Sequence, residues 1–379
     1  MLKRLRSWIS AGSPSEPGNE GIVQRDPPSA VHATGVPAFA IAPNQAVQNG
    51  FPALDWQAAQ AWVDAIPDLE ARPGAWTELE RAWLEHLRSA LGGAYTLRES
   101  DASALVSTLE PNVAEATLGF MAKTLQRVVR VLDGIAEVPA WGKDILLVFD
   151  DEETYYRYAS QFYPDGEFAG SGGMYINAGC GHFVTVKSDL RAIEPTIVHE
   201  MTHGCLGHLP IPAWLNEGLA VNTEQRLCPV PPQRLTPHQM HAKHRRFWGD
   251  GEIQEFWSGK SFLRNDDANM LSYDLARILV AQLSAADWSS FRDFVLHADG
   301  DDAGSSAAAK HLDVELGALA CALLEREPTT SWAPNPKAWS GAPERGAFSR
   351  SRPAARRARR GCPRTRRRPS GRGSATCRS

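Results

Sequence analysis

The chain has 379 residues, 43% of them hydrophobic, so it is long enough to bury a substantial core in one large domain or two smaller ones. Its net charge of −4 is unevenly distributed. Residues 331–379 hold fourteen of the forty basic residues and one of the forty-four acidic residues, which leaves a charge of −17 on the rest. An acidic body argues against nucleic acid as a partner and fits a soluble enzyme.

The N-terminal segment and the cysteines indicate in which cellular compartment the protein is expected. After Lys3, Arg4 and Arg6 the chain runs into Ser, Gly and Pro without the apolar core of a signal peptide, and no apolar run reaches about eighteen residues. The six cysteines form no Cys-x-x-Cys pair. We therefore expect free thiols, a cytoplasmic location and no membrane segment.

Residue patterns predict the elements in chain order. Residues 1–50, rich in Pro, Gly, Ser and Ala, are expected to be disordered. From Leu54 onward, apolar residues at three- and four-residue spacings predict helices, and short apolar runs predict strands. The helices are expected at 55–66, 77–91, 112–133 and 152–162. The strands are expected at 95–99, 144–149, 174–176 and 182–186, the last two as a hairpin.

The predicted helix over residues 193–206 carries the motif His199-Glu200-Met201-Thr202-His203. Histidines four apart lie on one face of a helix, where their ring nitrogens can share one tetrahedral zinc at about 2.0 Å. Glu200 follows the first histidine and can act as a base on a water molecule at the metal, as a metalloprotease requires. The alternative is a pair of core histidines bound to backbone carbonyls.

A third zinc ligand is expected from Glu217, which thirteen residues separate from His203, near the start of a second predicted helix. His208 competes for this role. The pattern HExxHxxGxxH needs a glycine three residues and a histidine six residues after the second ligand. Those positions hold Leu206 and Leu209, so the spacing favours Glu217.

The motif HExxH followed by Pro-Ala-Trp-Leu-Asn-Glu-Gly-Leu-Ala at 212–220 resembles the gluzincins, the thermolysin-like zincins, and in particular the bacterial peptidase-MA-like proteins. The resemblance covers about residues 95–324. It implies a zincin-like α+β fold, in which a small mixed sheet and an active-site helix precede a mainly helical C-terminal half. It also implies that His199, His203 and Glu217 bind zinc and that Glu200 is the catalytic base.

The same resemblance suggests further site features. Gluzincins often carry a helical tyrosine that hydrogen-bonds the oxyanion, and the segment at 272–280 is similar to that helix, so Tyr273 is the candidate, with a packing role as the alternative. An edge strand within residues 174–186 would bind an extended substrate. His182 would face the cleft or, as we favour, the surface. His238, His241 and His244 are interpreted as a solvated helix face rather than a second metal site.

Together these features predict zinc-dependent hydrolysis of peptide or protein substrates by a domain over residues 51–330, with residues 51–93 as its helical preface. The Arg-rich residues 331–379 are expected to be a disordered tail, whether functional or translated from a wrong frame. One alternative is a catalytically inactive binding protein with the zincin fold. Another is association with nucleic acid through the basic tail.

Overall fold

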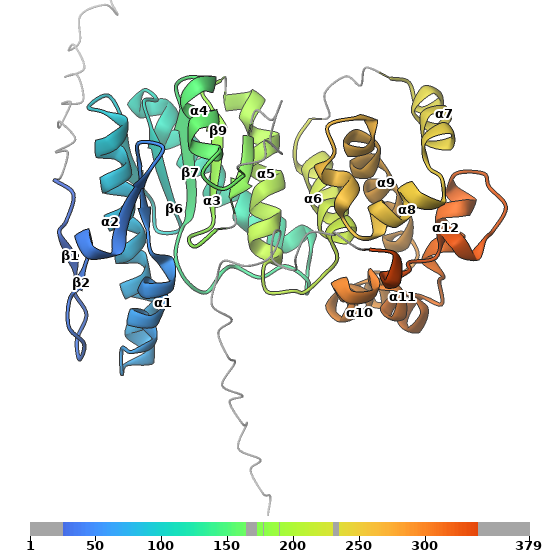
Figure 1. The fold of residues 1–379 in the computed structure, drawn as a ribbon, viewed down its shortest axis with the longest axis horizontal. Helices are drawn as coiled ribbons and strands as arrows, with labels where there is room; N and C mark the ends of the chain where they lie inside the picture. The colour runs from blue at the N-terminus through green and yellow to red at the C-terminus, as the bar shows by residue number, and fades with distance from the viewer. Residues whose placement is uncertain (1–25, 164–172, 177, 189, 230–234, 340–379) are drawn as a thin grey trace, which may run out of the picture.

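The computed structural model describes residues 26–163, 173–176, 178–188, 190–229 and 235–339. These residues form an α+β fold. A small mixed sheet with its covering helices makes up one half, and a group of helices makes up the other (Figure 1). Within the described ranges, no helix is both long and apolar enough to cross a membrane.

Five strands form the central sheet, in the order β5 (Thr96–Glu99), β6 (Ser103–Ser107), β7 (Asp144–Phe149), β9 (His182–Val186) and β8 (Gly173–Ile176). β6, β7 and β9 are parallel, whereas β5 and β8 pair antiparallel at the two edges. The predicted strands and the β8–β9 hairpin are confirmed, but the residue pattern did not predict β6. Its Ser-Ala-Leu-Val-Ser run is short, and all five residues are buried between β5 and β7.

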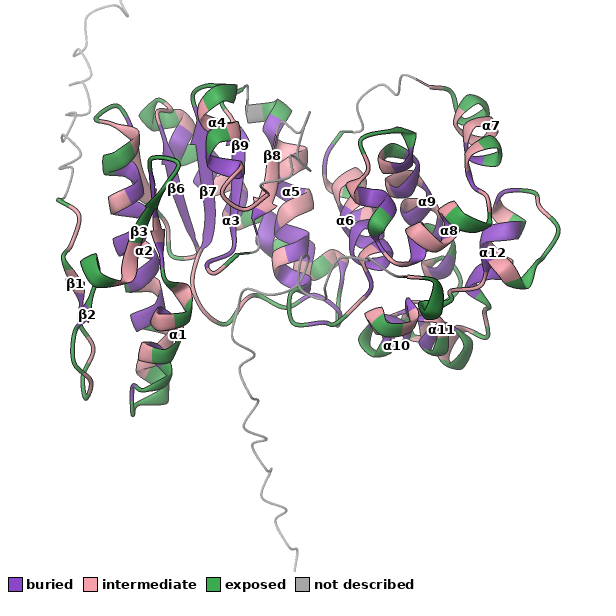
Figure 2. Ribbon diagram, viewed as in Figure 1, coloured by how far each residue is buried: buried purple, intermediate pink, exposed green. Residues whose placement is uncertain are grey.

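Helices cover both faces of the sheet, and its strands are buried between them (Figure 2). One face packs against α1 (Trp56–Asp64), α2 (Arg72–Leu91) and α4 (Glu152–Ala159), and the other packs against α3 (Pro111–Val131) and α5 (Leu190–Leu206). β7 contributes to both layers. Ile145 and Leu147 belong to the core that includes α2 and α4, whereas Leu146 and Val148 belong to the core that includes α3 and α5. Strand alternation therefore supplies apolar residues to two separate layers.

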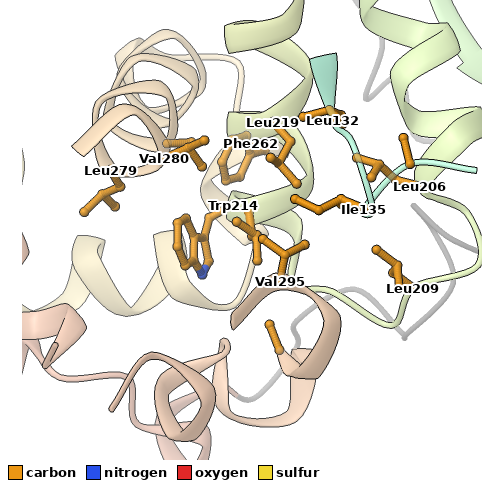
Figure 3. Packing of buried hydrophobic residues seen from close by; sticks show 14 of the residues in the cluster. Leu132, Ile135, Leu206, Leu209, Trp214, Leu219, Phe262, Leu279, Val280 and Val295 are labelled. Atoms are coloured by element: carbon orange, nitrogen blue, oxygen red, sulfur yellow. The ribbon is translucent and has the colours of Figure 1, made fainter. Parts of the chain in front are cut away.

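The C-terminal half is helical. Its α-helices are α6 (Ala213–Leu227), α7 (Pro237–Phe247), α8 (Asp250–Trp257), α9 (Asp267–Ser284), α10 (Trp288–His297), α11 (Ser305–Leu312) and α12 (Leu316–Leu323). Short 3₁₀ helices cover Ala42–Asn44, Leu69–Ala71, Lys260–Leu263, Gly300–Asp302, Thr330–Trp332 and Pro336–Ala338. The core of this half includes Trp214 and Leu219 from α6, Val280 from α9 and Val295 from α10 (Figure 3). It is continuous with the core under α3 and α5.

Residues 26–50 are folded, which differs from the disorder predicted for residues 1–50. They contribute two small antiparallel pairs, β1 (Ala30–Val31) with β2 (Phe39–Ala40) and β3 (Gln45–Gln48) with β4 (Phe51–Leu54). Val31, Phe39 and Ile41 are buried in the core that includes α2. These isolated apolar residues lack any period, so the pattern could not predict their burial. Residues 1–25 lie outside the described ranges.

The folded body also extends past the predicted boundary at residue 330. Trp332 is 1% exposed, and its backbone carbonyl accepts a hydrogen bond from Trp257 Nε1 at 2.8 Å. Gln254 Nε2 donates to the carbonyls of Ser331 and Ala333 at 2.9 and 2.8 Å. This segment therefore packs onto α8. The rest of the predicted tail, residues 340–379, lies outside the described residues.

Candidate metal centre

Helix α5 presents the two histidines of the HExxH motif to the helical half. Ile197 and Met201 belong to the core that α5 shares with the sheet and α3. His199 and His203 lie four residues apart, and their ring centroids are 4.9 Å apart. The helix begins at Leu190, three residues before the predicted start at residue 193, and Pro195 therefore lies inside it.

Helix α6 supplies the third residue, and the consecutive residues of its first turns have different partners. Trp214 is fully buried, and its Nε1 donates to the carbonyl of Ala303 at 3.0 Å, which anchors the start of the helix. Asn216 and Glu217 face α5, where Asn216 contacts His203 and Glu217 contacts both histidines. Gly218 faces α9. The run that resembles the gluzincins thus anchors α6 and aims its carboxylate.

Three ligand atoms converge between α5 and α6. Glu217 Oε2 lies 3.2 Å from His199 Nε2 and 3.4 Å from His203 Nε2. Ligand atoms about 2.0–2.1 Å from a tetrahedral zinc lie about 3.3–3.4 Å apart. His199, His203 and Glu217 form the one group of three or more possible ligand residues found within the described ranges, with the atoms within 4.8 Å of one another. Two imidazoles and one carboxylate at this spacing could hold a metal ion.

The outer nitrogens of both rings are held by side chains of α6. His199 Nδ1 lies 3.2 Å from Glu224 Oε2, and His203 Nδ1 lies 3.1 Å from Asn216 Oδ1. Because carboxylate and amide oxygens accept hydrogen bonds, each Nδ1 is the donor. In a neutral ring, Nε2 then carries the lone pair, and both lone pairs face the Glu217 carboxylate. A proton or a metal cation between them makes this arrangement favourable.

The electrostatics of the group reflect this convergence. Burial alone would raise the pKa of the Glu217 carboxyl, but the charges and hydrogen bonds of His203 and His199 lower it to about 2. Burial opposes the charged form of His199, yet hydrogen bonds with Glu217 and Glu224 raise its pKa well above the usual value. The pKa of His203 is raised by Glu217 in the same way. In the metal-free protein, Glu217 is therefore ionised and the histidines favour protonation.

Glu200 and Tyr273 belong to the same electrostatic neighbourhood. Burial raises the pKa of the Glu200 carboxyl, although the nearby charges of His199 and His203 oppose that shift. The Tyr273 ring lies 6.2 Å from the His199 ring, measured between centroids, and packs edge-on against Phe262. Burial and the carboxylates of Glu217 and Glu200 hold the pKa of Tyr273 well above its usual value. Its hydroxyl therefore stays protonated and is available as a donor.

Other candidate histidines lie away from this group. His208 is exposed in the turn after α5. His182 is neither in a cleft nor on the surface, because it is 1% exposed and hydrogen-bonds Tyr158 Oη at 2.7 Å in the core that includes α2. His244, expected on a solvated face, is 1% exposed and pairs with Asp274 at 2.9 Å.

Glu224 and Asn216 were not predicted as partners of the histidines. Glu224 follows Glu217 by seven residues, about two helical turns, which places both carboxylates on one face of α6. That spacing is visible in the sequence. Whether Glu224 reaches His199 depends on the angle at which α6 crosses α5, and the residue pattern does not predict that angle.

No protein-family model matches the chain, and no curated protein matches it either.

Proposed function

We propose that the protein is a zinc-dependent peptidase of the gluzincin type, with His199, His203 and Glu217 as its zinc ligands. One observation carries the proposal: two ring nitrogens and a carboxylate oxygen converge at 3.2 and 3.4 Å, the spacing of zinc ligands. Three protein ligands leave a fourth position for water and substrate, as in catalytic zinc sites. The strand order, with antiparallel β8 at the sheet edge, is compatible with a zincin-like fold.

The chain's own residues supply the acid–base chemistry. Zinc bound by this group would supply a Lewis acid that polarises the scissile carbonyl and acidifies water. Glu200 accepts a proton from the water that attacks the carbonyl carbon. It delivers that proton to the amine nitrogen as the C–N bond breaks. Its raised pKa suits both transfers. The protonated hydroxyl of Tyr273 would donate to the oxyanion that forms on the carbonyl oxygen.

An extended peptide is the substrate that the neighbouring strand favours. β8 is the outermost strand beside β9 in the described sheet, and it packs against α5. A Cβ added to Gly173 would lie 3.0 Å from Thr196 Cγ2, so the strand approaches the helix closely. The edge of a sheet is where an extended peptide can add as a further strand. The proposed substrates are therefore peptides or extended segments of proteins.

The test is cleavage of a peptide library by the protein stripped of metal and then reloaded with Zn²⁺. We expect hydrolysis by the reloaded protein and none by the stripped protein. Tyr273→Phe should lower kcat by ~10²–10³-fold with little change in zinc content, because one oxyanion donor is lost. Stoichiometric zinc without cleavage of any peptide would favour the inactive binding protein instead. Unchanged turnover of Tyr273→Phe would leave Tyr273 a packing residue.

A further inference from the structure

Helices α6 and α9 approach each other closely at Gly218, the residue after Glu217. A Cβ added to Gly218 would lie 2.6 Å from the backbone oxygen of Ala276 and 2.6 Å from Val280 Cγ2. Neither atom is the far end of a flexible side chain, so no larger residue fits unless α9 moves. Glycine inside a helix costs about 1 kcal/mol relative to alanine. Its presence here is therefore explained by the close approach of α9.

Asn222, one turn further along α6, joins the two helices by hydrogen bonds. Its Nδ2 donates to the carbonyl of Gly218 at 2.7 Å and to the carbonyl of Arg277 at 2.9 Å. One amide group thus bridges α6 and α9 beside the glycine contact. We call Gly218 and Asn222 together the α6–α9 clamp.

The clamp adjoins a proposed ligand on α6 and the candidate oxyanion donor on α9. Gly218 adjoins Glu217 on α6, and its contact Ala276 lies three residues after Tyr273 on α9, on the same side of that helix. The separation of the two helices at this point therefore fixes how near the Tyr273 ring comes to His199, now 6.2 Å between ring centroids. The ligand residues themselves lie on α5 and α6, so an outward shift of α9 would leave them together.

We propose that Gly218 and Asn222 are positioning residues, which hold Tyr273 within reach of the metal centre without contacting the reacting atoms. The proposal rests on the proposed function, because it needs a metal between α5 and α6. Gly218→Ala displaces α9, since the added Cβ must move from 2.6 Å to at least the 3.4 Å of ordinary contact. Close-packed interiors transmit such a strain along a rigid helix and do not absorb it locally.

Co²⁺ offers a readout that does not depend on hydrolysis. A 3-fluorotyrosine incorporated at position 273 gives one fluorine resonance, and Co²⁺ bound by His199, His203 and Glu217 broadens it according to the inverse sixth power of distance. With the 6.2 Å between the Tyr273 and His199 ring centroids standing in for the fluorine–Co²⁺ separation, an outward shift of 0.8 Å should lower the broadening to roughly half in Gly218→Ala. Asn222→Ala should also reduce it and serves as the second variant if Gly218→Ala does not fold.

The matched control is Gly251→Ala on α8, where an added Cβ meets nothing within 4 Å. It makes the same chemical change in a helix and should keep the wild-type broadening. Co²⁺ bound with equal affinity and unchanged broadening in both clamp variants would overturn the clamp alone. A wild-type protein that binds no Co²⁺ would overturn the metal centre, and the clamp proposal with it.

Discussion

Removing the Glu224 carboxylate should weaken zinc binding although Glu224 is not proposed as a ligand. Its Oε2 accepts the Nδ1 hydrogen of His199 at 3.2 Å, which fixes the ring so that Nε2 faces Glu217. A hydrogen bond to a charged group contributes about 1.5–3 kcal/mol. The Glu224 side chain is 27% exposed, so we take the lower end, about 1.5 kcal/mol, which is about tenfold in Kd. Glu224→Ala should therefore raise the Kd for zinc about tenfold.

The assay is competition for zinc against a chelating dye at constant pH and ionic strength. The matched control is Glu194→Ala on α5. The carboxylates of Glu194 and Glu224 both act on the thiol of Cys228, so they share a neighbourhood. Glu194→Ala removes one negative charge there but keeps the His199–Glu224 hydrogen bond, and should change the Kd little. Equal losses in the two variants would mean that net charge, and not ring orientation, sets the affinity. Wild-type affinity in Glu224→Ala would show that the Glu224 hydrogen bond does not contribute to zinc binding.

Three further predictions concern the ligands, the fold and pH. Metal analysis should show that Glu217→Ala loses stoichiometric zinc and that His208→Ala keeps it, because His208 is exposed and lies outside the ligand group. The reverse result would overturn the gluzincin assignment. A chain that ends after residue 330 loses the buried Trp332, which should lower the free energy of unfolding by about 3–5 kcal/mol and the calorimetric Tm by roughly 10 °C. A chain that ends after residue 339 should keep the wild-type Tm. Equal Tm values for the two chains would show that residues 331–339 contribute nothing to stability. Zinc affinity should continue to increase as the pH is raised beyond 6.5, the ordinary pKa of histidine. The reason is that zinc displaces protons from His199 and His203, whose pKa values without metal lie above 6.5. An affinity that is constant above pH 6.5 in chelator competition would contradict this prediction.

The parts of the fold that could be predicted are those with a strong local period. β7 and β9 were predicted with their observed bounds, and α3 was predicted to within two residues at each end. In the same way, a spacing of four brings His199 and His203 together whatever surrounds them. Local spacing alone could therefore indicate a metal centre.

The parts that could not be predicted depend on contacts between distant segments. Ile41 and Trp332 sit in segments rich in proline, glycine and serine, and each is buried by elements far away in the sequence. β6 is recognisable as a strand only beside β7. Glu224 contacts His199 because of the angle at which α6 crosses α5. Tertiary packing decides all of these features, and the pattern of single residues does not encode it.

Metal analysis combined with peptide cleavage, for wild type and Glu200→Gln, tests both the zinc site and the role of Glu200 as the base. Glutamine keeps the size of the side chain but cannot accept the proton of the attacking water. We predict near-stoichiometric zinc in both proteins, with hydrolysis in the wild type alone. Hydrolysis by Glu200→Gln at the wild-type rate would mean that Glu200 is not the base, and wild-type protein without zinc after loading would mean that the site does not hold zinc.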